Sequence, residues 1–300
     1  MSTPAVTEAA QRERAAQRQD AAAQSTLAAP EQRRRGRWFT WLLALPVPLL
    51  LLLLWDRGVY GEWTLPFDIK MAFLPTPAEV AVRLADLAVG GIVEDSYSRT
   101  LWAHLGASAL RVFQGFAIAA VAAVPLGVVM GRSRLIFRLL DPTVNLIRPV
   151  PVTAWAPLSL LIIGFGDRAT VFLVFLAAFF PILLNTLDGV RRVPERLLEA
   201  SAMLGTPPVQ ALYKVVLPSA VPSIVSGLRI ALGLAWVILV VGETVGISTG
   251  LGAMITQARD QARTDLIISG MAVIGLAGFL ADRALLLLAR VAVGRRPLLA

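Results

Sequence analysis

Six apolar segments constrain the fold of this chain more than any other feature. They cover approximately residues 38–55, 105–130, 150–165, 169–187, 221–245 and 266–288. A helix of about 18 residues extends roughly 27 Å, close to the thickness of the hydrocarbon core of a bilayer. The segment at 150–165 is the weakest span because it is short and contains Pro151 and Pro157, which leave backbone groups without helical partners. The pattern predicts an all-α membrane protein with six transmembrane helices.

The composition agrees with a membrane protein and excludes several other classes. Hydrophobic residues make up 56% of the chain and charged residues only 16%, whereas soluble domains have about 25% charged residues. The net charge of +8 does not indicate nucleic-acid binding, because the Arg residues flank apolar segments and no aromatic–basic motif accompanies them. The chain has no Cys and a single His, His104. We therefore expect no disulfide, no metal site and no catalytic site, and we interpret His104 as an interfacial side chain.

The first 36 residues differ from the rest of the chain. They are rich in Ala, Gln and Arg and hold almost no large apolar residues, so they cannot bury enough surface to offset the entropy lost on ordering. We predict a disordered cytoplasmic tail over 1–36 and a transmembrane domain over 37–300. A cleaved signal peptide is disfavoured because a long polar stretch precedes the first apolar segment and no small-residue cleavage site follows it.

The distribution of Lys and Arg predicts the orientation in the membrane. The segments that we assign to the cytoplasm hold 18 Lys and Arg residues, whereas the outer segments hold 7. The outer segment 56–104 also carries seven acidic residues. Because positive charge accumulates on the cytoplasmic side, we expect both termini in the cytoplasm, which requires an even number of spans.

Two stretches outside the apolar segments have the pattern of short helices. Thr76-Pro77 has the form of a helix start, with Thr as the cap and Pro in the first turn. Apolar residues then recur on one face, whereas Arg83 and Asp86 fall elsewhere. This pattern predicts an amphipathic helix lying on the membrane or on the helix bundle. The stretch 250–263 is a second candidate.

The polar loop at about 191–218 has more organisation than a simple connector, because loops in helix bundles usually have about 2–8 residues. Its first part, up to residue 204, has the pattern of a short helix. Gly205 can adopt positive φ and should end that helix. Thr206 then caps a second helix with Pro207 at its first position, and Pro218 ends this helix and begins the fifth apolar segment. The sequence predicts two short helices that meet at an angle.

The spacing within this loop resembles the cytoplasmic loop of bacterial ABC importer permeases. It reads Glu-Ala-x, three residues, Gly, nine residues, and an aliphatic residue followed by x-Leu-Pro. One departure is Ser201, which stands where the family usually has a second Ala. Further matches are LPTP at 74–77, RPVP at 148–151, FFPILLNT at 179–186 and RTDL at 263–266. They resemble the nitrate, sulfonate and taurine subfamily over about residues 40–292.

The resemblance implies a fold, partners and a site. It implies a type I importer bundle in the bacterial inner membrane, a homodimer, a separate cytoplasmic ATPase and an outer substrate-binding protein. The chain holds no GxxxxGK[ST] phosphate-binding loop, so we expect no enzyme activity and no cofactor on this chain, with ATP and Mg²⁺ on the partner subunit. The residues that would couple the loop to the ATPase are Glu199, Ala200, Ser201, Gly205, Thr206, Pro207, Val215, Leu217 and Pro218.

Two charged residues of the fifth segment, Arg229 and Glu243, are further candidates. Ionisable residues inside membrane spans are often functional, so both could line a pathway or gate, although an ion pair would also explain them. The substrate is expected to be a small anion such as an organic sulfonate, taurine or nitrate, or another solute such as a heterocyclic precursor. A stand-alone secondary transporter or channel, and a membrane anchor without transport activity, are the alternative functions.

Overall fold

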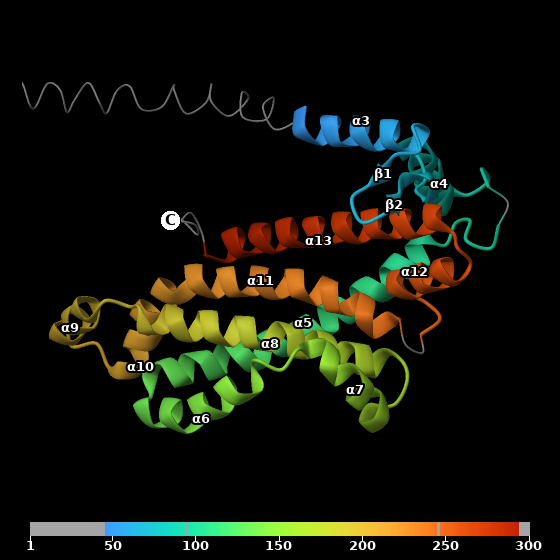
Figure 1. The fold of residues 1–300 in the computed structure, drawn as a ribbon. Helices are drawn as coiled ribbons and strands as arrows, with labels where there is room; N and C mark the ends of the chain where they lie inside the picture. The colour runs from blue at the N-terminus through green and yellow to red at the C-terminus, as the bar shows by residue number, and fades with distance from the viewer. Residues whose placement is uncertain (1–45, 94, 245–246, 294–300) are drawn as a thin grey trace, which may run out of the picture. The chain divides into compact units, whose positions relative to one another are not determined.

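The computed structural model describes residues 46–93, 95–244 and 247–293. The chain divides into two compact units, and the boundary along the sequence lies between Pro77 and Ala78. The predicted tail and the beginning of the first apolar segment, residues 38–45, lie outside the described residues. Figure 1 shows the elements with their labels.

The described part of the first unit is a helix followed by a small hairpin. Helix α3 (Pro46–Tyr60) carries exposed leucines from Leu49 to Leu54. Strands β1 (Thr64–Leu65) and β2 (Ile69–Lys70) pair antiparallel, and the 3₁₀ turn η1 (Met71–Phe73) follows. Gly58 of α3 lies directly against the Met71 side chain, so the end of this helix packs on the turn.

Every regular secondary-structure element described in the second unit is a helix. Its elements are α4 (Pro77–Val89), α5 (Leu101–Arg132), α6 (Arg134–Ile147), η2 (Val152–Ala154), α7 (Trp155–Ile163), α8 (Asp167–Arg191), α9 (Glu195–Met203), α10 (Pro208–Ala211), the π-helical turn η3 (Leu212–Val216), α11 (Leu217–Glu243), α12 (Leu251–Asp260) and α13 (Thr264–Val293).

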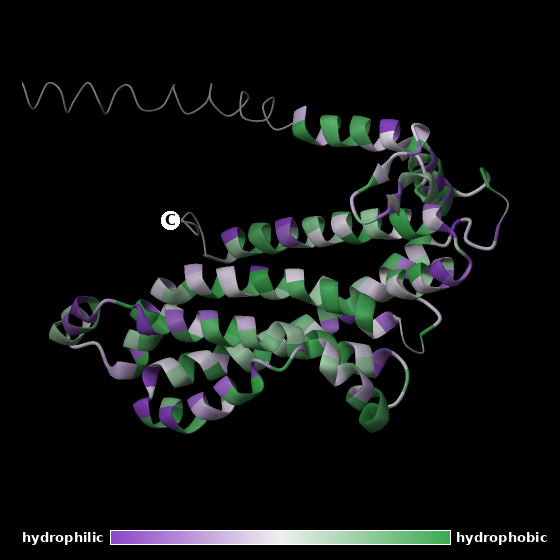
Figure 2. Ribbon diagram, viewed as in Figure 1, coloured by the Kyte–Doolittle hydropathy of each residue, from purple (hydrophilic) through white to green (hydrophobic). Residues whose placement is uncertain are grey.

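Four described helices are long and apolar enough to cross a membrane. They are α5, α8, the continuous helix from Pro208 to Glu243, and α13, and they coincide with the predicted second, fourth, fifth and sixth segments. Hydrophobic residues dominate these helices, with a few hydrophilic residues among them (Figure 2). The predicted all-α membrane class is confirmed.

The predicted third span is short and interrupted, as its prolines indicated. Residues 150–165 form η2 and the nine-residue α7, and the stretch before them, which falls between the predicted second and third spans and was assigned to the cytoplasm, forms the helix α6. Helices α6 and α7 bend by 74° relative to each other and together could form one broken span. Prolines and glycines at 149–166 interrupt the hydrogen-bond ladder here.

Helix α8 is the centre of the bundle, packed between α5 and α11. Glycines on α5 permit the close approach to α8. A Cβ added to Gly115 would lie 2.7 Å from Val174, and one added to Gly127 would lie 2.8 Å from Thr186. Small residues allow such backbone contact between membrane helices, so these glycines permit the short distance between α5 and α8.

Candidate functional site

The 191–218 loop contains the two predicted short helices, and Gly205 forms the turn between them. Gly205 has φ +71°. Its N–H donates to the Ala202 carbonyl at 2.9 Å, and the Thr206 N–H donates to the Ser201 carbonyl at 3.0 Å. These two bonds form a Schellman motif, which requires a left-handed residue at the position of Gly205. The predicted stop at Gly205 is therefore confirmed in its conformation.

The loop has an exposed tip and a buried base. Met203 is 88% exposed and Leu204 85% exposed, and Glu199 and Ala200 are exposed as well. Ser201 is buried and its hydroxyl donates to the Leu198 carbonyl at 2.7 Å. At the base, Val216 and neighbouring apolar residues, including Leu198 and Leu217, form a small hydrophobic cluster. The cluster fixes the base of the loop, while the tip presents apolar side chains to the surroundings.

Two details of the predicted loop are wrong. The second helix begins one residue later than expected, with Pro207 at the cap position and Pro208 in the first turn, so Thr206 is not its cap. Pro218 does not end this helix. The helix continues from α10 through the π-helical turn into α11 without a break, because Pro218 follows the wider π turn and lies in the first turn of α11. Val215 lies within the π turn.

Arg229 lies in an ion pair between two spanning helices. Its Nε is 2.7 Å from Oδ1 of Asp282, and its Nη2 is 3.0 Å from Oδ2 of the same residue. Asp282 belongs to α13, so this bidentate pair joins α11 to α13. The guanidinium remains one-third exposed. A pathway role for Arg229 stays a prediction.

Glu243 lies at the last position of α11 in a buried polar centre. Its side chain is fully buried and forms an ion pair with Arg111 of α5. The Ser108 hydroxyl also donates to the Glu243 carboxylate at 2.8 Å, and the Gly252 N–H donates at 2.8 Å. Arg111 in turn contacts Asp167 of α8 at 2.8 Å. The centre therefore joins α5, α8 and α11, and a gate role for Glu243 stays a prediction.

The same centre holds the beginning of α12. Three successive N–H groups, those of Gly250, Leu251 and Gly252, donate to side chains of His104, Ser108 and Glu243, respectively. These donors have no partner within the helix. His104 is buried and accepts a hydrogen bond from Gly250, whereas an interfacial side chain was predicted.

Ser108 and Arg111 were missed as well. His104, Ser108 and Arg111 lie one turn apart on a single face of α5. One sequence feature could have indicated this centre. Arg111 is the single Arg of the second apolar segment, and its charge is opposite to that of Glu243 in the fifth.

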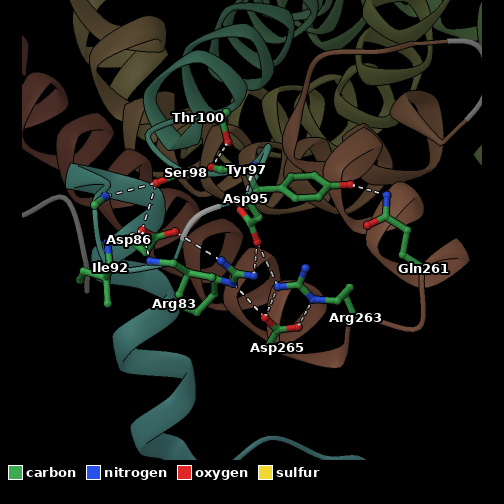
Figure 3. Close-up of polar contacts among 12 residues, drawn as sticks. Arg83, Asp86, Ile92, Asp95, Tyr97, Ser98, Thr100, Gln261, Arg263 and Asp265 are labelled. Atoms are coloured by element: carbon green, nitrogen blue, oxygen red, sulfur yellow. Dashed lines mark hydrogen bonds and ion pairs between the residues drawn. The ribbon is translucent and has the colours of Figure 1, made fainter.

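A second ion network fastens the far end of α12 (Figure 3). Arg83 of α4 is almost fully buried and contacts Asp95 at 2.6 Å and Asp265 at 2.8 Å. Arg263 contacts the same two carboxylates at 3.2 and 2.9 Å. The expectation that Arg83 and Asp86 face away from the packed side of α4 is wrong, because these ion pairs satisfy their charges inside the unit.

Asp86 holds the connection between α4 and α5. Its Oδ1 accepts the N–H groups of Val93 and Ile92, each at 3.0 Å, and the Ser98 hydroxyl at 3.0 Å. These bonds lower the pKa of Asp86 below its ordinary value despite burial, and the bond from the Val93 N–H contributes most. For Arg83, burial lowers the pKa, but the hydrogen bonds to Asp95 and Asp265 outweigh it, so its pKa is raised.

A cavity of about 580 Å³ lies along α6, α8 and α11. Its lining is mixed, with Arg148, Asp141 and Asp188 beside apolar residues such as Phe180 and Leu184. Within the described residues, no group of three or more metal-binding side chains comes together.

One protein family matches more than half of the chain. Its description is "binding-protein-dependent transport system inner membrane component", and it matches residues 123–295. The chain belongs to this family. It is therefore a transport permease of the inner membrane, and the resemblance read from its motifs is confirmed.

Similar proteins agree with this assignment. The taurine transport system permease protein TauC of Escherichia coli is 36% identical over 265 residues, 86% of this chain and 92% of TauC. The nitrate import permease protein NrtB of Synechocystis is 31% identical over 235 residues, 78% of this chain and 82% of NrtB. A chain from the inward-facing MetNI methionine ABC transporter has a TM-score of 0.49 and 24% identity, covering 66% of this chain and 95% of that one.

Proposed function

We propose that this chain forms the translocation pathway of an ATP-driven importer and that ATP is hydrolysed on a separate cytoplasmic subunit. The observation that carries the proposal is the geometry of the 191–218 loop. A pair of short helices with an exposed apolar tip lies between two spanning helices, and its base packs in a hydrophobic cluster. An exposed apolar surface of this kind is typical of an interaction site.

The tip of the loop supplies the contact with the ATPase. Met203 and Leu204 would enter an apolar cleft on that subunit, and the exposed carboxylate of Glu199 would form polar contacts at its rim. ATP and Mg²⁺ would be bound by that partner. The excess of positive charge in the loop and near the termini supports placement of both termini and of this loop in the cytoplasm.

The assembly would contain two copies of this chain and an outer substrate-binding protein. In a homodimer, the cavity along α6, α8 and α11 would be part of the pathway, closed by the second copy. The family description names dependence on a binding protein.

The solute would be a small oxyanion or sulfonate, since the similar permeases carry the names of taurine and nitrate transport. The cavity lining offers Arg148 for an anionic group.

The proposal is tested by purifying the tagged chain together with its neighbouring ATPase and binding protein and reconstituting them in liposomes. We expect an ATPase subunit to co-purify, and ATP-dependent accumulation of the solute that the binding protein binds. Solute flux by this chain alone, without ATPase, would refute the proposal in favour of a stand-alone transporter. Reporter fusions at the C-terminus and near residue 85 test the orientation, and a cytoplasmic signal at residue 85 would contradict it.

A further inference from the structure

One continuous helix joins the 191–218 loop to the buried centre around Glu243. This helix, which we call the drive helix, runs from Pro208 to Glu243 and has 36 residues. At 1.5 Å per residue it extends about 54 Å. Its first turn is α10, part of the loop that carries the proposed ATPase contact, and its last residue is Glu243. A displacement of α10 along or about the helix axis therefore reaches Glu243 without an intervening loop.

The Glu243 carboxylate is bound by an ion pair and several hydrogen bonds as well as by packing. A fully buried carboxylate is costly unless it is paired and hydrogen-bonded, and here Arg111, Ser108 and Gly252 all satisfy it. The glycines of α12 permit this contact. A Cβ at Gly250, whose φ is +153°, would lie 2.5 Å from the Glu243 carboxylate, and one at Gly252 would lie 2.9 Å from the Val240 carbonyl oxygen.

Helix α12 is held at both of its ends by different parts of the unit. Its beginning is bound by Glu243 of the drive helix together with His104 and Ser108. Its end is held through Arg263 to Asp95 and Asp265, and through Gln261 to the Tyr97 hydroxyl at 3.0 Å (Figure 3). One face of α12 is fully buried, including Met254 and Ala258. The fastening at Glu243 is the one that movement of the drive helix would change.

We propose that Glu243 is a positioning residue that latches α12 to the drive helix, so that closure of the end of the bundle opposite the loop depends on the state of the ATPase. In the structure described here the latch is closed. When the ATPase moves α10, the drive helix shifts Glu243 relative to Arg111 and releases the beginning of α12, while the network at the other end retains the helix. The inference rests on the proposed function, because it requires the loop to contact an ATPase.

The latch predicts a specific defect for Glu243→Gln in the complex with the ATPase and the binding protein. The amide keeps the size of the side chain and can accept the Gly252 N–H, but it loses the ion pair with Arg111. We expect basal ATPase activity without the binding protein to rise several-fold and its stimulation by the loaded binding protein to be largely lost. A purely structural role would lower both activities together with the amount of complex.

A second readout reports the opening of α12 itself. The chain has no native Cys, so Ala253→Cys introduces a single thiol at a position that is only 2% exposed. We expect this thiol to react slowly with a membrane-impermeant maleimide when Glu243 is intact. Adding Glu243→Gln should increase the labelling rate about tenfold, as expected for the loss of one charge-assisted hydrogen bond.

Asp260→Asn is the matched control. Like Glu243→Gln it removes one negative charge, here at the end of α12, but its partner Arg259 is exposed and the pair contributes little. We expect it to change neither readout. If Glu243→Gln does not accumulate in the membrane, Arg111→Gln removes the positive charge of the same ion pair and should give the same two effects.

The outcomes separate the latch from the proposed function. Wild-type labelling and wild-type coupling in the Glu243 variant would overturn the latch. Faster labelling with unchanged ATPase coupling would also overturn it, since the centre would then only stabilise the fold. Failure of the wild-type chain to bind or stimulate an ATPase would instead refute the proposed function.

Discussion

Gly205→Val should uncouple transport from ATP hydrolysis without preventing insertion. The φ of Gly205 is +71°, and no atom lies within 4 Å of a Cβ added there, so the cost of the substitution is conformational rather than a steric clash. A strained residue of this kind costs about 1–3 kcal/mol, and a β-branched residue resists positive φ strongly. An energy of this size changes the population of the native turn by roughly 5- to 150-fold.

This energy would be relieved locally. The two hydrogen bonds of the Schellman motif are each worth about 0.5–1.5 kcal/mol, so the turn can give them up and reorient α9 relative to α10, while the cluster at the base keeps the bundle folded. We expect the stimulated ATPase activity of the reconstituted complex to fall at least about fivefold, the lower limit of that population change, at unchanged membrane abundance.

Two variants control for this reasoning. Gly205→Asn should retain most of the activity, because Asn tolerates the left-handed region. Gly91→Val carries the same type of strain, since Gly91 has φ +85° and no atom within 4 Å of an added Cβ, but it lies far along the chain from the loop and should leave coupling intact. Wild-type stimulation in Gly205→Val, or an equal loss in Gly91→Val, would refute the argument.

Three further predictions concern packing and charge. Gly127→Ala should lower stability by about 1–3 kcal/mol because its Cβ meets α8, whereas Gly106→Ala on the same helix meets open space and should be neutral or stabilising; thermal denaturation in detergent compares the two. Because the pKa of Asp86 is lowered in the fold, its stabilising contribution is complete above the ordinary value of 3.8 and is lost as the pH falls towards the lower folded-state pKa. Thermal midpoints below pH 4 should therefore fall more steeply for the native protein than for Asp86→Asn, and parallel curves would contradict this. Alanine substitutions of Arg229 and Asp282 should show a coupling energy of about 0.6–1.7 kcal/mol in a double-mutant cycle, the range of polar contacts between membrane helices, and a value near zero would show that the pair does not stabilise the contact of α11 with α13.

The sequence predicted the features that depend on local physics. Long apolar runs predicted the spanning helices because hydropathy alone determines which segments can lie in lipid. The conformation of Gly205 was predictable since a helix that stops in a polar loop commonly ends on a left-handed glycine. The start of the helix near Thr76-Pro77 was predicted correctly because Pro is favoured in the first turn of a helix.

The sequence failed where distant residues decide the structure. Arg83 and Asp86 look like a solvated face when α4 is considered alone, and only the fold brings Asp265, far along the chain, next to Arg83. The helix continues through Pro218 because a π turn precedes it, and no local sequence pattern predicts that turn. The stretch between the second and third predicted spans is the helix α6 because its apolar residues pack in a cluster with residues of α5 and α8, a contact that the sequence alone does not show.

The central position of α8 has a consequence for how this protein can change during evolution. Half of its apolar window is buried within the chain, compared with 17% of that of α13, and among its described residues no large apolar side chain is exposed. The outer face of α13 can exchange one apolar residue for another at little cost, because lipid adapts to any shape. Substitutions on α8 must instead match two neighbours at once, so we expect natural variants of this chain to differ mainly on α13 and rarely on α8.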